Sequence, residues 1–391
     1  MNHPVPDRLS DDFPFADHNQ EMRSAWDAYH RGAPYRVPVI VGTNTRFFMF
    51  NANANPEGMD FERYTEDPNL MFDVALRYQR WSRFNLLQDA ELGLPERWWI
   101  GIDFQNYYES AWFGCKVHYI PGEVPDTRPD FFDSPERVME NGLPGPFSGI
   151  MSRAIEYYEA MKARAQKEAF LDRPIEVGAP GCGMGSDGPM TVACNLFGPE
   201  FVCTAMAEEP DRMRELFTFI TDATLQRMMA FRKKYGVPVP QDGFGMADDS
   251  IALISTAMYR EQILPHHRRL YNTLGNDTPR SIHLCGNSTR HFLTLRDELN
   301  IRTFDTGFPV DFGQLRQSLG PDVRIQGGPH VELLRSATPE QVREEVRRIL
   351  ATGVLEGGMF VLREGNNLAP GTPLENIEAM VHAGREFGML N

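Results

Sequence analysis

The feature that most constrains the fold is a repeated pattern in the second half of the chain. A short apolar run of strand length is followed by a polar or glycine-containing turn and then by an amphipathic helical stretch. The runs are Gly243–Ala247, Ser281–Leu284, Ile301–Phe304, Val323–Gln326 and Met359–Leu362. Strands that alternate with helices pair in parallel, because each helix returns the chain to the same end of the sheet. The pattern therefore predicts an α/β fold with a parallel sheet.

The same pattern extends into the first half. Earlier strands are predicted at Arg36–Gly42, Ile100–Phe104 and Ile175–Gly178. About eight such units in 391 residues indicate one domain, a TIM-type (β/α)8 barrel over residues 1–391. Residues 1–35 are predicted to be an N-terminal extension, and the aromatic, proline-rich stretch 98–146 an insertion near the barrel mouth. An open doubly wound sheet is the alternative, but no G-x-G-x-x-G fingerprint opens an early helix.

Helix boundaries are also readable. The helical region Pro199–Tyr235 should break near Glu209–Pro210, because proline lacks a backbone donor and clashes with the preceding turn. Two segments, Thr338–Gln341 and Thr372–Glu375, place threonine as N-cap, proline first in the helix, and glutamine or glutamate third. Both therefore predict a capped helix start.

Charge and cysteine usage exclude several classes of protein. The formal net charge is −15 and the lysines and arginines are scattered, which argues against nucleic-acid partners and anionic membrane surfaces. The start of the chain lacks the pattern of a signal peptide, and no run of about eighteen apolar residues occurs. Five cysteines, an odd number, suit thiols in a reducing compartment. These features predict a cytoplasmic protein.

Polar residues gather directly after five successive predicted strands. They are Asp248, Asp249, His283, Cys285, Asp305, Gly327, Gly328, His330, Glu364, Asn366 and Asn367. In a βα barrel such positions converge on one mouth, where the active site lies. Any single one of them could equally be a turn or cap residue, so the prediction of a site depends on the coincidence.

His283-Leu-Cys285 is the strongest candidate for a metal site. Residues i and i+2 of a strand point to the same face, and zinc accepts imidazole and thiolate together. The alternative is a buried cysteine beside a hydrogen-bonded histidine. A third ligand would have to come from another strand end, and no cysteine follows Cys285.

Three residues after earlier strands are weaker candidates. Arg46 could anchor a carboxylate or phosphate, or form a surface ion pair. Asp103 and Glu109 either line the mouth or cap it. The glycine-rich stretch Gly181–Gly188 lacks the lysine of a phosphate loop, so a tight turn is the better interpretation.

Several segments resemble, in order, those of the uroporphyrinogen decarboxylase superfamily, and in particular its methylcobamide-dependent methyltransferases, which demethylate a corrinoid protein. The matching segments are Asp187–Ala193 (G-P-x-T-x-A), Asp248–Ser250 with Met258, Tyr259 and Pro265, Ile282–Asn287 (H-x-C-G-N), Asp305, Gln326–Gly328 and Pro370–Asn376 (P-x-T-P-x-E-N). Shared order over six segments is far more specific than any one motif.

Two departures qualify this resemblance. The decarboxylase branch carries an R-Q-A-G-R segment where this chain has Thr43–Arg46, which disfavours a polycarboxylate porphyrinogen. The methyltransferase branch supplies a third zinc ligand, a cysteine, at the position of Asn366. Glu364 is the first choice as substitute and His330 the second; otherwise the metal has fewer protein ligands, or zinc has been lost.

The resemblance implies an enzyme, a methyltransferase that moves a methyl group between a corrinoid, free or on a partner protein, and a thiol or other small acceptor. Zinc would be held by His283, Cys285 and Glu364, with Asp248, Asp305 and Cys285 as catalytic residues. The expected substrate-binding residues are Arg46, Asp103, Asp249, Gly327, Gly328 and Asn366. The alternatives are a metal-free decarboxylase or lyase and a corrinoid-binding homologue without catalysis. Related proteins lead us to expect a homodimer.

Overall fold

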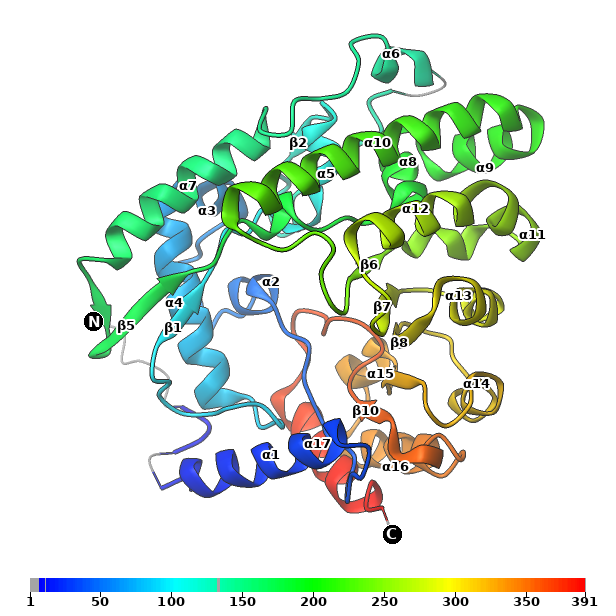
Figure 1. Cartoon of the computed structure of the whole chain (residues 1–391). Helices are drawn as coiled ribbons and strands as arrows, with labels where there is room; N and C mark the ends of the chain where they lie inside the picture. Colours follow the sequence, from blue (N-terminus) through cyan, green and yellow to red (C-terminus); the bar gives the residue numbers. More distant parts are fainter. Residues whose placement is uncertain (1–6, 11, 132–133, 391) are drawn as a thin grey trace.

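The computed structural model describes residues 7–10, 12–131 and 134–390, with strands on the inside and helices around them (Figure 1). The main sheet has five strands in the order β10-β9-β8-β7-β6, and every neighbouring pair is parallel. Their bounds are β6 Gly245–Ala247, β7 Arg280–Leu284, β8 Ile301–Thr306, β9 Arg324–Gly327 and β10 Phe360–Leu362. The five strands predicted in the second half and their parallel pairing are confirmed.

The remaining parallel strands come from the first half. β1 (Trp98–Ile100) pairs in parallel with β5 (Arg173–Val177), whose other edge carries β4 (Ala169–Phe170) in an antiparallel hairpin. The segment 37–41 follows β10 in parallel through a bridge from Val39 to Leu362. Within the described ranges no strand ladder joins β5 to β6, so a continuously hydrogen-bonded closed barrel stays a prediction.

The stretch 98–146 contains more than loops. It begins with β1, which starts two residues before the predicted strand and ends at Ile100. After η1 (Gln105–Tyr107) and α5 (Tyr108–Trp112), a small antiparallel hairpin of β2 (Val117–His118) and β3 (Asp126–Thr127) precedes α6 (Pro135–Met139). Its placement as an insertion over the mouth stays a prediction.

The other helices follow the predicted alternation. They are α1 Phe15–His30, α2 Thr45–Met49, α3 Phe61–Glu66, α4 Pro68–Asn85, α7 Ile150–Ala165, η2 Gly181–Gly183, α8 Pro189–Phe197, α9 Pro199–Glu208, α10 Pro210–Tyr235, η3 Asp249–Leu253, α11 Thr256–Met258, η4 Tyr259–Ile263, α12 Leu264–Leu274, η5 Thr289–His291, α13 Phe292–Leu299, α14 Phe312–Leu319, α15 Val331–Ser336, α16 Pro339–Leu350, η6 Glu356–Gly358 and α17 Leu374–Phe387. The predicted break is confirmed, since α9 ends at Glu208 and α10 begins at Pro210.

Of the two predicted capping boxes, one forms. Thr338 accepts a hydrogen bond from the backbone of Gln341, whose side chain caps Thr338 in return, at the start of α16. The prediction at Thr372 is wrong. Its hydroxyl donates instead to the carbonyl of Ala369 at 2.8 Å, and α17 begins at Leu374 without a side-chain cap.

Side chains of the main sheet alternate between two environments. On β7, Ile282 and Leu284 are each 1% exposed among the surrounding helices, whereas His283 is only partly buried. On β8, Phe304 is fully buried and Asp305 only partly so. The outward faces therefore build the core, and the inward faces carry polar groups.

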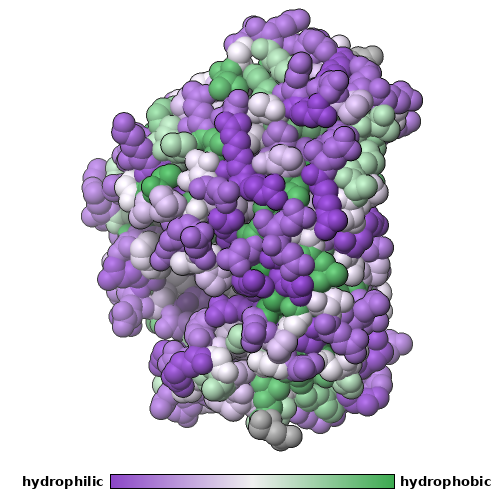
Figure 2. Space-filling view, turned by 45° about the vertical axis from the view of Figure 1, so that its right-hand side comes forward, coloured by the Kyte–Doolittle hydropathy of each residue, from purple (hydrophilic) through white to green (hydrophobic). Residues whose placement is uncertain are grey.

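Figure 2 shows one face of the molecule, largely hydrophilic with small scattered hydrophobic groups. Among the described residues no single helix is long and apolar enough to cross a membrane. The bent pair of α8 and α9, at 112°, passes a test of length and composition only when the two are taken together.

A buried ion-pair cluster fixes the N-terminal residues to the rest of the fold. The Asp89 side chain is fully buried and accepts hydrogen bonds from the Val39 backbone at 2.7 Å, from Arg36 at 2.5 Å and from Arg385 at 2.6 Å. Burial by itself would raise the pKa of Asp89, but the hydrogen bonds from Arg36 and the two guanidinium charges lower it overall. Asp89 therefore holds the first strand segment and α17 together as a carboxylate.

We expect Asp89→Asn to destabilise the protein by about 3–5 kcal/mol, because it leaves Arg36 buried with a neutral partner. Urea unfolding followed by circular dichroism measures this. Glu21→Gln is the matched control, since Glu21 pairs with the same arginine but its side chain is 46% exposed, and it should cost less than about 1 kcal/mol. Equal effects of the two substitutions would contradict the prediction.

Candidate functional site

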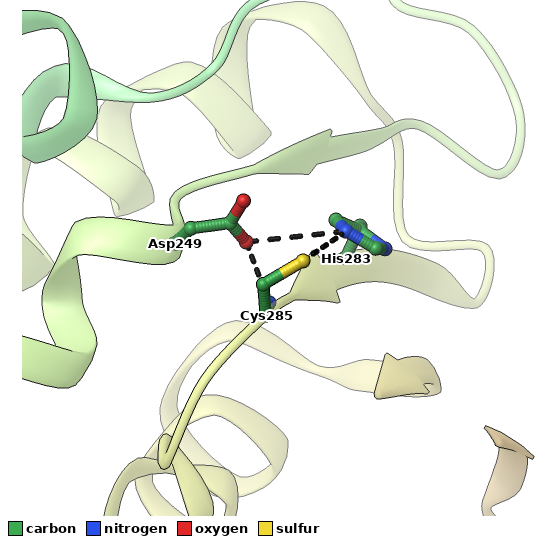
Figure 3. A group of neighbouring side chains, drawn as sticks. All are labelled: Asp249, His283 and Cys285. Atoms are coloured by element: carbon green, nitrogen blue, oxygen red, sulfur yellow. Dashed lines mark hydrogen bonds and ion pairs between the residues drawn. The ribbon is translucent and has the colours of Figure 1, made fainter. Parts of the chain in front are cut away.

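His283 and Cys285 lie side by side at the end of β7, and Asp249 faces them from the start of η3 (Figure 3). The Nε2 atom of His283 is 3.0 Å from the Cys285 Sγ atom and 4.0 Å from the Asp249 Oδ1 atom. That carboxylate also accepts the backbone N–H of Cys285 at 2.6 Å. One ligand atom from each residue lies within 4.8 Å of the other two, so the three side chains could share one metal ion.

Asp305 orients the histidine from behind. Its Oδ2 atom is 2.8 Å from His283 Nδ1, which leaves Nε2 directed at Cys285. A carboxylate on the far nitrogen is the usual support of a metal-binding histidine, because it fixes the tautomer and the ring plane. Arg363 donates to the same Oδ2 atom at 3.1 Å and so holds Asp305 in turn.

Burial, hydrogen bonds and neighbouring charges shift the pKa values of His283 and Cys285. Burial lowers the pKa of His283, but hydrogen bonds to Asp305 and Cys285 and their charges outweigh it and raise the pKa to about 10. Burial raises the pKa of the Cys285 thiol, although His283 acts in the opposite direction. A metal ion would replace both protons, since imidazole and thiol bind metals only when deprotonated.

Glu364, the predicted third ligand, has other partners. Its side chain is fully buried and accepts the backbone N–H of Gly42 at 3.0 Å to each oxygen and Arg363 Nη2 at 2.9 Å. The structure thus brings Asp249, and not Glu364, beside His283 and Cys285. The expected role of Asp249 as a substrate-binding residue and of Glu364 as a ligand stay predictions.

Asp248 points away from its neighbour Asp249. Its side chain is fully buried, with Oδ2 2.8 Å from His267 Nε2 and Oδ1 accepting both the backbone N–H and the hydroxyl of Thr191 at 2.8 Å. It therefore joins the end of β6 to α8 and α12. The structure does not bring it to the metal-ligand cluster, and its catalytic role stays a prediction.

Asp103 lines a cavity of about 450 Å³ bounded by residues that follow the first two strands. It accepts hydrogen bonds from the Thr45 hydroxyl at 2.7 Å, the Tyr64 hydroxyl at 3.0 Å and the Gln105 side chain at 2.7 Å. Arg46 lines the same cavity. The structure therefore brings together the two substrate-binding residues predicted in the first half.

The strand-end glycines are explained by close packing. A side chain on Gly327 would come within 2.4 Å of the Thr306 hydroxyl, and one on Gly328 within 2.1 Å of the Arg363 carbonyl. Asn366 is half-buried and accepts the backbone N–H of the following residue at 2.8 Å. Whether these residues bind substrate stays a prediction.

His330, the second candidate ligand, lies at the start of α15. Its Nδ1 atom accepts the backbone N–H of Glu332 at 3.0 Å, so it caps that helix and is exposed. Glu109 also has a structural partner, because it forms a fully buried ion pair with Arg227 at 2.6 Å.

Two residues near the cluster were not predicted as part of the site. Burial, and then the negative charges of Glu109 and Asp249, raise the pKa of Asp187 to about 7. Arg363 bridges Asp305 and Glu364. The available signals were the glycine-flanked position of Asp187 after β5 and the position of Arg363 directly after β10.

Comparisons with known proteins point to one family. The family model described as uroporphyrinogen decarboxylase (URO-D) matches residues 21–387. A methylated-thiol–coenzyme M methyltransferase of Methanosarcina mazei is 31% identical over 296 residues, 72% of this chain and 71% of the relative. A uroporphyrinogen decarboxylase of Pelobacter propionicus is 26% identical over 68% of this chain and 74% of its own.

The fold has a solved counterpart. A methyltransferase from Methanosarcina mazei superposes with a TM-score of 0.62 at 18% identity, covering 94% of this chain and 98% of its own. At that identity the likeness concerns the fold alone. With relatives that are methyltransferases and decarboxylases, and a family match over almost the whole length, this chain belongs to the uroporphyrinogen decarboxylase (URO-D) family.

Proposed function

We propose that this protein is a methyltransferase that moves a methyl group between a corrinoid and a small thiol, with zinc held by His283, Cys285 and Asp249. The observation that carries the proposal is the clustering of these three ligand atoms within 4.8 Å of one another. The relative at 31% identity, whose name is that of a thiol methyltransferase, supports the reaction class.

The donor set fits zinc. Thiolate, imidazole and carboxylate are the common protein ligands of zinc. Catalytic zinc sites have three protein ligands in all and leave a fourth position for water or substrate. The side chains of His283 and Asp249 are 30% and 40% exposed, so a substrate could reach a metal ion held by them. Asp305 on the far nitrogen of His283 completes the arrangement.

Bound zinc would supply a thiolate at neutral pH, because coordination stabilises the deprotonated sulfur. The substrate thiol would lose its proton to solvent, and its sulfur would take the methyl group from the corrinoid. The electron pair of the carbon–cobalt bond would stay with the corrinoid, so that the transfer needs no oxidant or reductant. The protein would have to hold the substrate sulfur in one position. The residues that hydrogen-bond to the proposed metal ligands would do this.

Both predicted catalytic aspartates, Asp248 and Asp305, act as positioning residues in this scheme. Asp305 sets the tautomer of His283. Asp248 holds Thr191, whose hydroxyl accepts the backbone N–H of Ser250 at 3.0 Å, and so fixes the start of η3, which carries Asp249. The methyl donor, a corrinoid or a protein that carries one, is the partner that the resemblance implies.

Replacing a ligand should remove the metal. We expect protein purified without chelator to contain about one zinc per chain, and His283→Ala, Cys285→Ala and Asp249→Asn each to lower zinc affinity by at least about tenfold. Elemental analysis and competition with a chromophoric chelator measure this. Methyl transfer from methylcobalamin to a thiol, followed by absorbance, should fall in parallel.

Glu364→Gln is the discriminating control, because Glu364 is the other carboxylate proposed as a ligand. It should keep its zinc if Asp249 is the third ligand. Loss of zinc in Glu364→Gln with retention in Asp249→Asn would reverse the assignment. Zinc-free protein that still transfers methyl groups after His283→Ala would exclude the proposed role of zinc. Zinc-loaded protein that transfers no methyl group from methylcobalamin to any thiol would exclude the methyltransferase and leave the decarboxylase or binding-protein alternatives.

Removing the support of the histidine should weaken binding without removing a ligand. We expect Asp305→Asn to reduce zinc affinity by roughly 10–100-fold, because the amide does not stabilise the Nδ1-protonated tautomer as a carboxylate does. The exposed Asp322→Asn is the control and should leave the affinity unchanged. Unchanged zinc affinity in Asp305→Asn would show that the hydrogen bond does not tune the site.

A further inference from the structure

Another cavity, of about 410 Å³, lies between the loop that joins α2 to α3 and the turn that joins β2 to β3. Its volume falls in the range of roughly 300–1,000 Å³ that is typical of small-molecule sites. None of its lining residues belongs to the cluster of Asp249, His283 and Cys285 or to the cavity of Arg46 and Asp103. A ligand in this cavity would therefore leave the proposed metal site free.

Hydrogen bonds hold both walls of the cavity in place. In the loop between α2 and α3, the buried Asn55 amide donates to the carbonyls of Met49 and Met59 at 2.8 and 3.0 Å. Its side-chain carbonyl accepts the Met59 N–H at 3.1 Å. On the opposite wall, the hydroxyl of Tyr119 lies 2.7 Å from that of Thr65 in α3. The cavity is therefore preformed, and a ligand does not have to order its walls.

The floor of the cavity is apolar. Met49, Met59 and Phe61 line it and are all buried. Phe50 lines it beside Phe61, with the two ring centroids 5.5 Å apart. Ile120 lies at the rim and is 41% exposed. Because apolar surface gains free energy when it leaves water, this floor fits a compact apolar or aromatic group.

The rim of the cavity carries negative charge only. Asp60, Glu62 and Glu123 line the cavity and are exposed, and no lysine or arginine is among the described residues that line it. Asp60 caps α3 by accepting the backbone N–H of Arg63 at 2.8 Å. Over residues 7–10, 12–131 and 134–390, none of the three carboxylates forms an ion pair. Carboxylates accept hydrogen bonds and attract cations, so the rim suits an ammonium group.

We infer that this cavity binds a small amphipathic amine, with its apolar body on the floor and its ammonium group among the carboxylates of the rim. Charge complementarity selects the cation, because a neutral ligand gains little from the three carboxylates and an anion is repelled. The lining is smaller than the roughly 20–30 residues that each side of a stable protein interface contributes, so a small molecule is the occupant that fits. The inference does not depend on methyl transfer.

The experiment compares three ligands that share one apolar body: phenethylamine, 2-phenylethanol and 3-phenylpropionate. Calorimetry at neutral pH and low salt should show the amine binding roughly three- to tenfold more tightly than the alcohol, as a few exposed ion pairs predict. The carboxylate should bind most weakly. Ethylamine, which lacks the ring, should bind at least about tenfold more weakly than phenethylamine. Equal affinities for the amine and the alcohol, or no saturable binding of the amine, would overturn the inference.

Neutralising the rim should remove the preference for the cation. We expect the double variant Glu62→Gln with Glu123→Gln to bind phenethylamine and 2-phenylethanol about equally, because both lost charges line the cavity. The matched control is Glu66→Gln with Glu140→Gln, which changes the net charge by the same amount at two exposed acids outside the lining. A preference that survives in the rim variant, or that falls equally in the control, contradicts the inference.

Shortening the apolar side chain at the rim should act on all three ligands alike. We expect Ile120→Ser to weaken both phenethylamine and 2-phenylethanol by about threefold and to keep their order, because it removes apolar surface and no charge. Leu143→Ser is the matched control, since Leu143 is also 41% exposed but lies outside the cavity. Unchanged affinities in Ile120→Ser would place the ligand elsewhere and overturn the inference.

Sedimentation of the same variants tests the other occupant, a second copy of this chain. A dimer of the unaltered protein that dissociates in Ile120→Ser but not in Leu143→Ser would assign the cavity to a subunit interface and overturn the inference. An affinity for phenethylamine that does not change with protein concentration supports the small-molecule site.

Discussion

The parallel register of the main sheet is the constraint on which the site depends. Neighbouring strands align Ala247 with His283, His283 with Asp305, and Asp305 with Gln326. Because all five strands run in the same direction, this alignment of neighbouring residues determines where each strand ends relative to the next. His283 and Asp305 come to hydrogen-bonding distance as direct partners in that row. A slip of one residue in either strand would turn one of them into the apolar core.

A second constraint is a continuous set of ionic contacts that crosses the sheet from its first strand segment to its middle. Arg363 has acids on both sides, Asp305 and Glu364, and Glu364 in turn holds Gly42. This explains why Glu364 does not approach Cys285. Its buried charge is balanced by Arg363, and moving it to a metal would leave that arginine with one partner fewer. Arg363 therefore contacts two carboxylates with different roles. Asp305 supports His283, and Glu364 accepts the backbone N–H of Gly42 at the end of the first strand segment.

Much of this arrangement could be predicted from the sequence, and the reason is periodicity. Apolar strand runs and the break at Pro210 depend on local chemistry, so their positions are readable, and the i, i+2 spacing placed His283 beside Cys285. The direction in which each strand-end side chain points could not be predicted from the sequence. Asp248 and Asp249 are adjacent, but Asp248 has φ −162° and ψ 72°, and its side chain enters the core while its neighbour faces the cluster. Only the tertiary contacts decide between such residues.

The exchange of ligand that we propose also preserves the charge of the site. The resemblance to the methyltransferase branch implies one imidazole and two thiolates as zinc ligands, and the two thiolates would neutralise the divalent ion. Here Asn366 at the position of the second cysteine is neutral and would leave an excess positive charge. In the proposed site Asp249 would supply the missing negative charge from a different strand end, next to Cys285. An incoming thiolate would then meet a neutral centre, although a carboxylate would stand in place of a softer and more strongly donating sulfur.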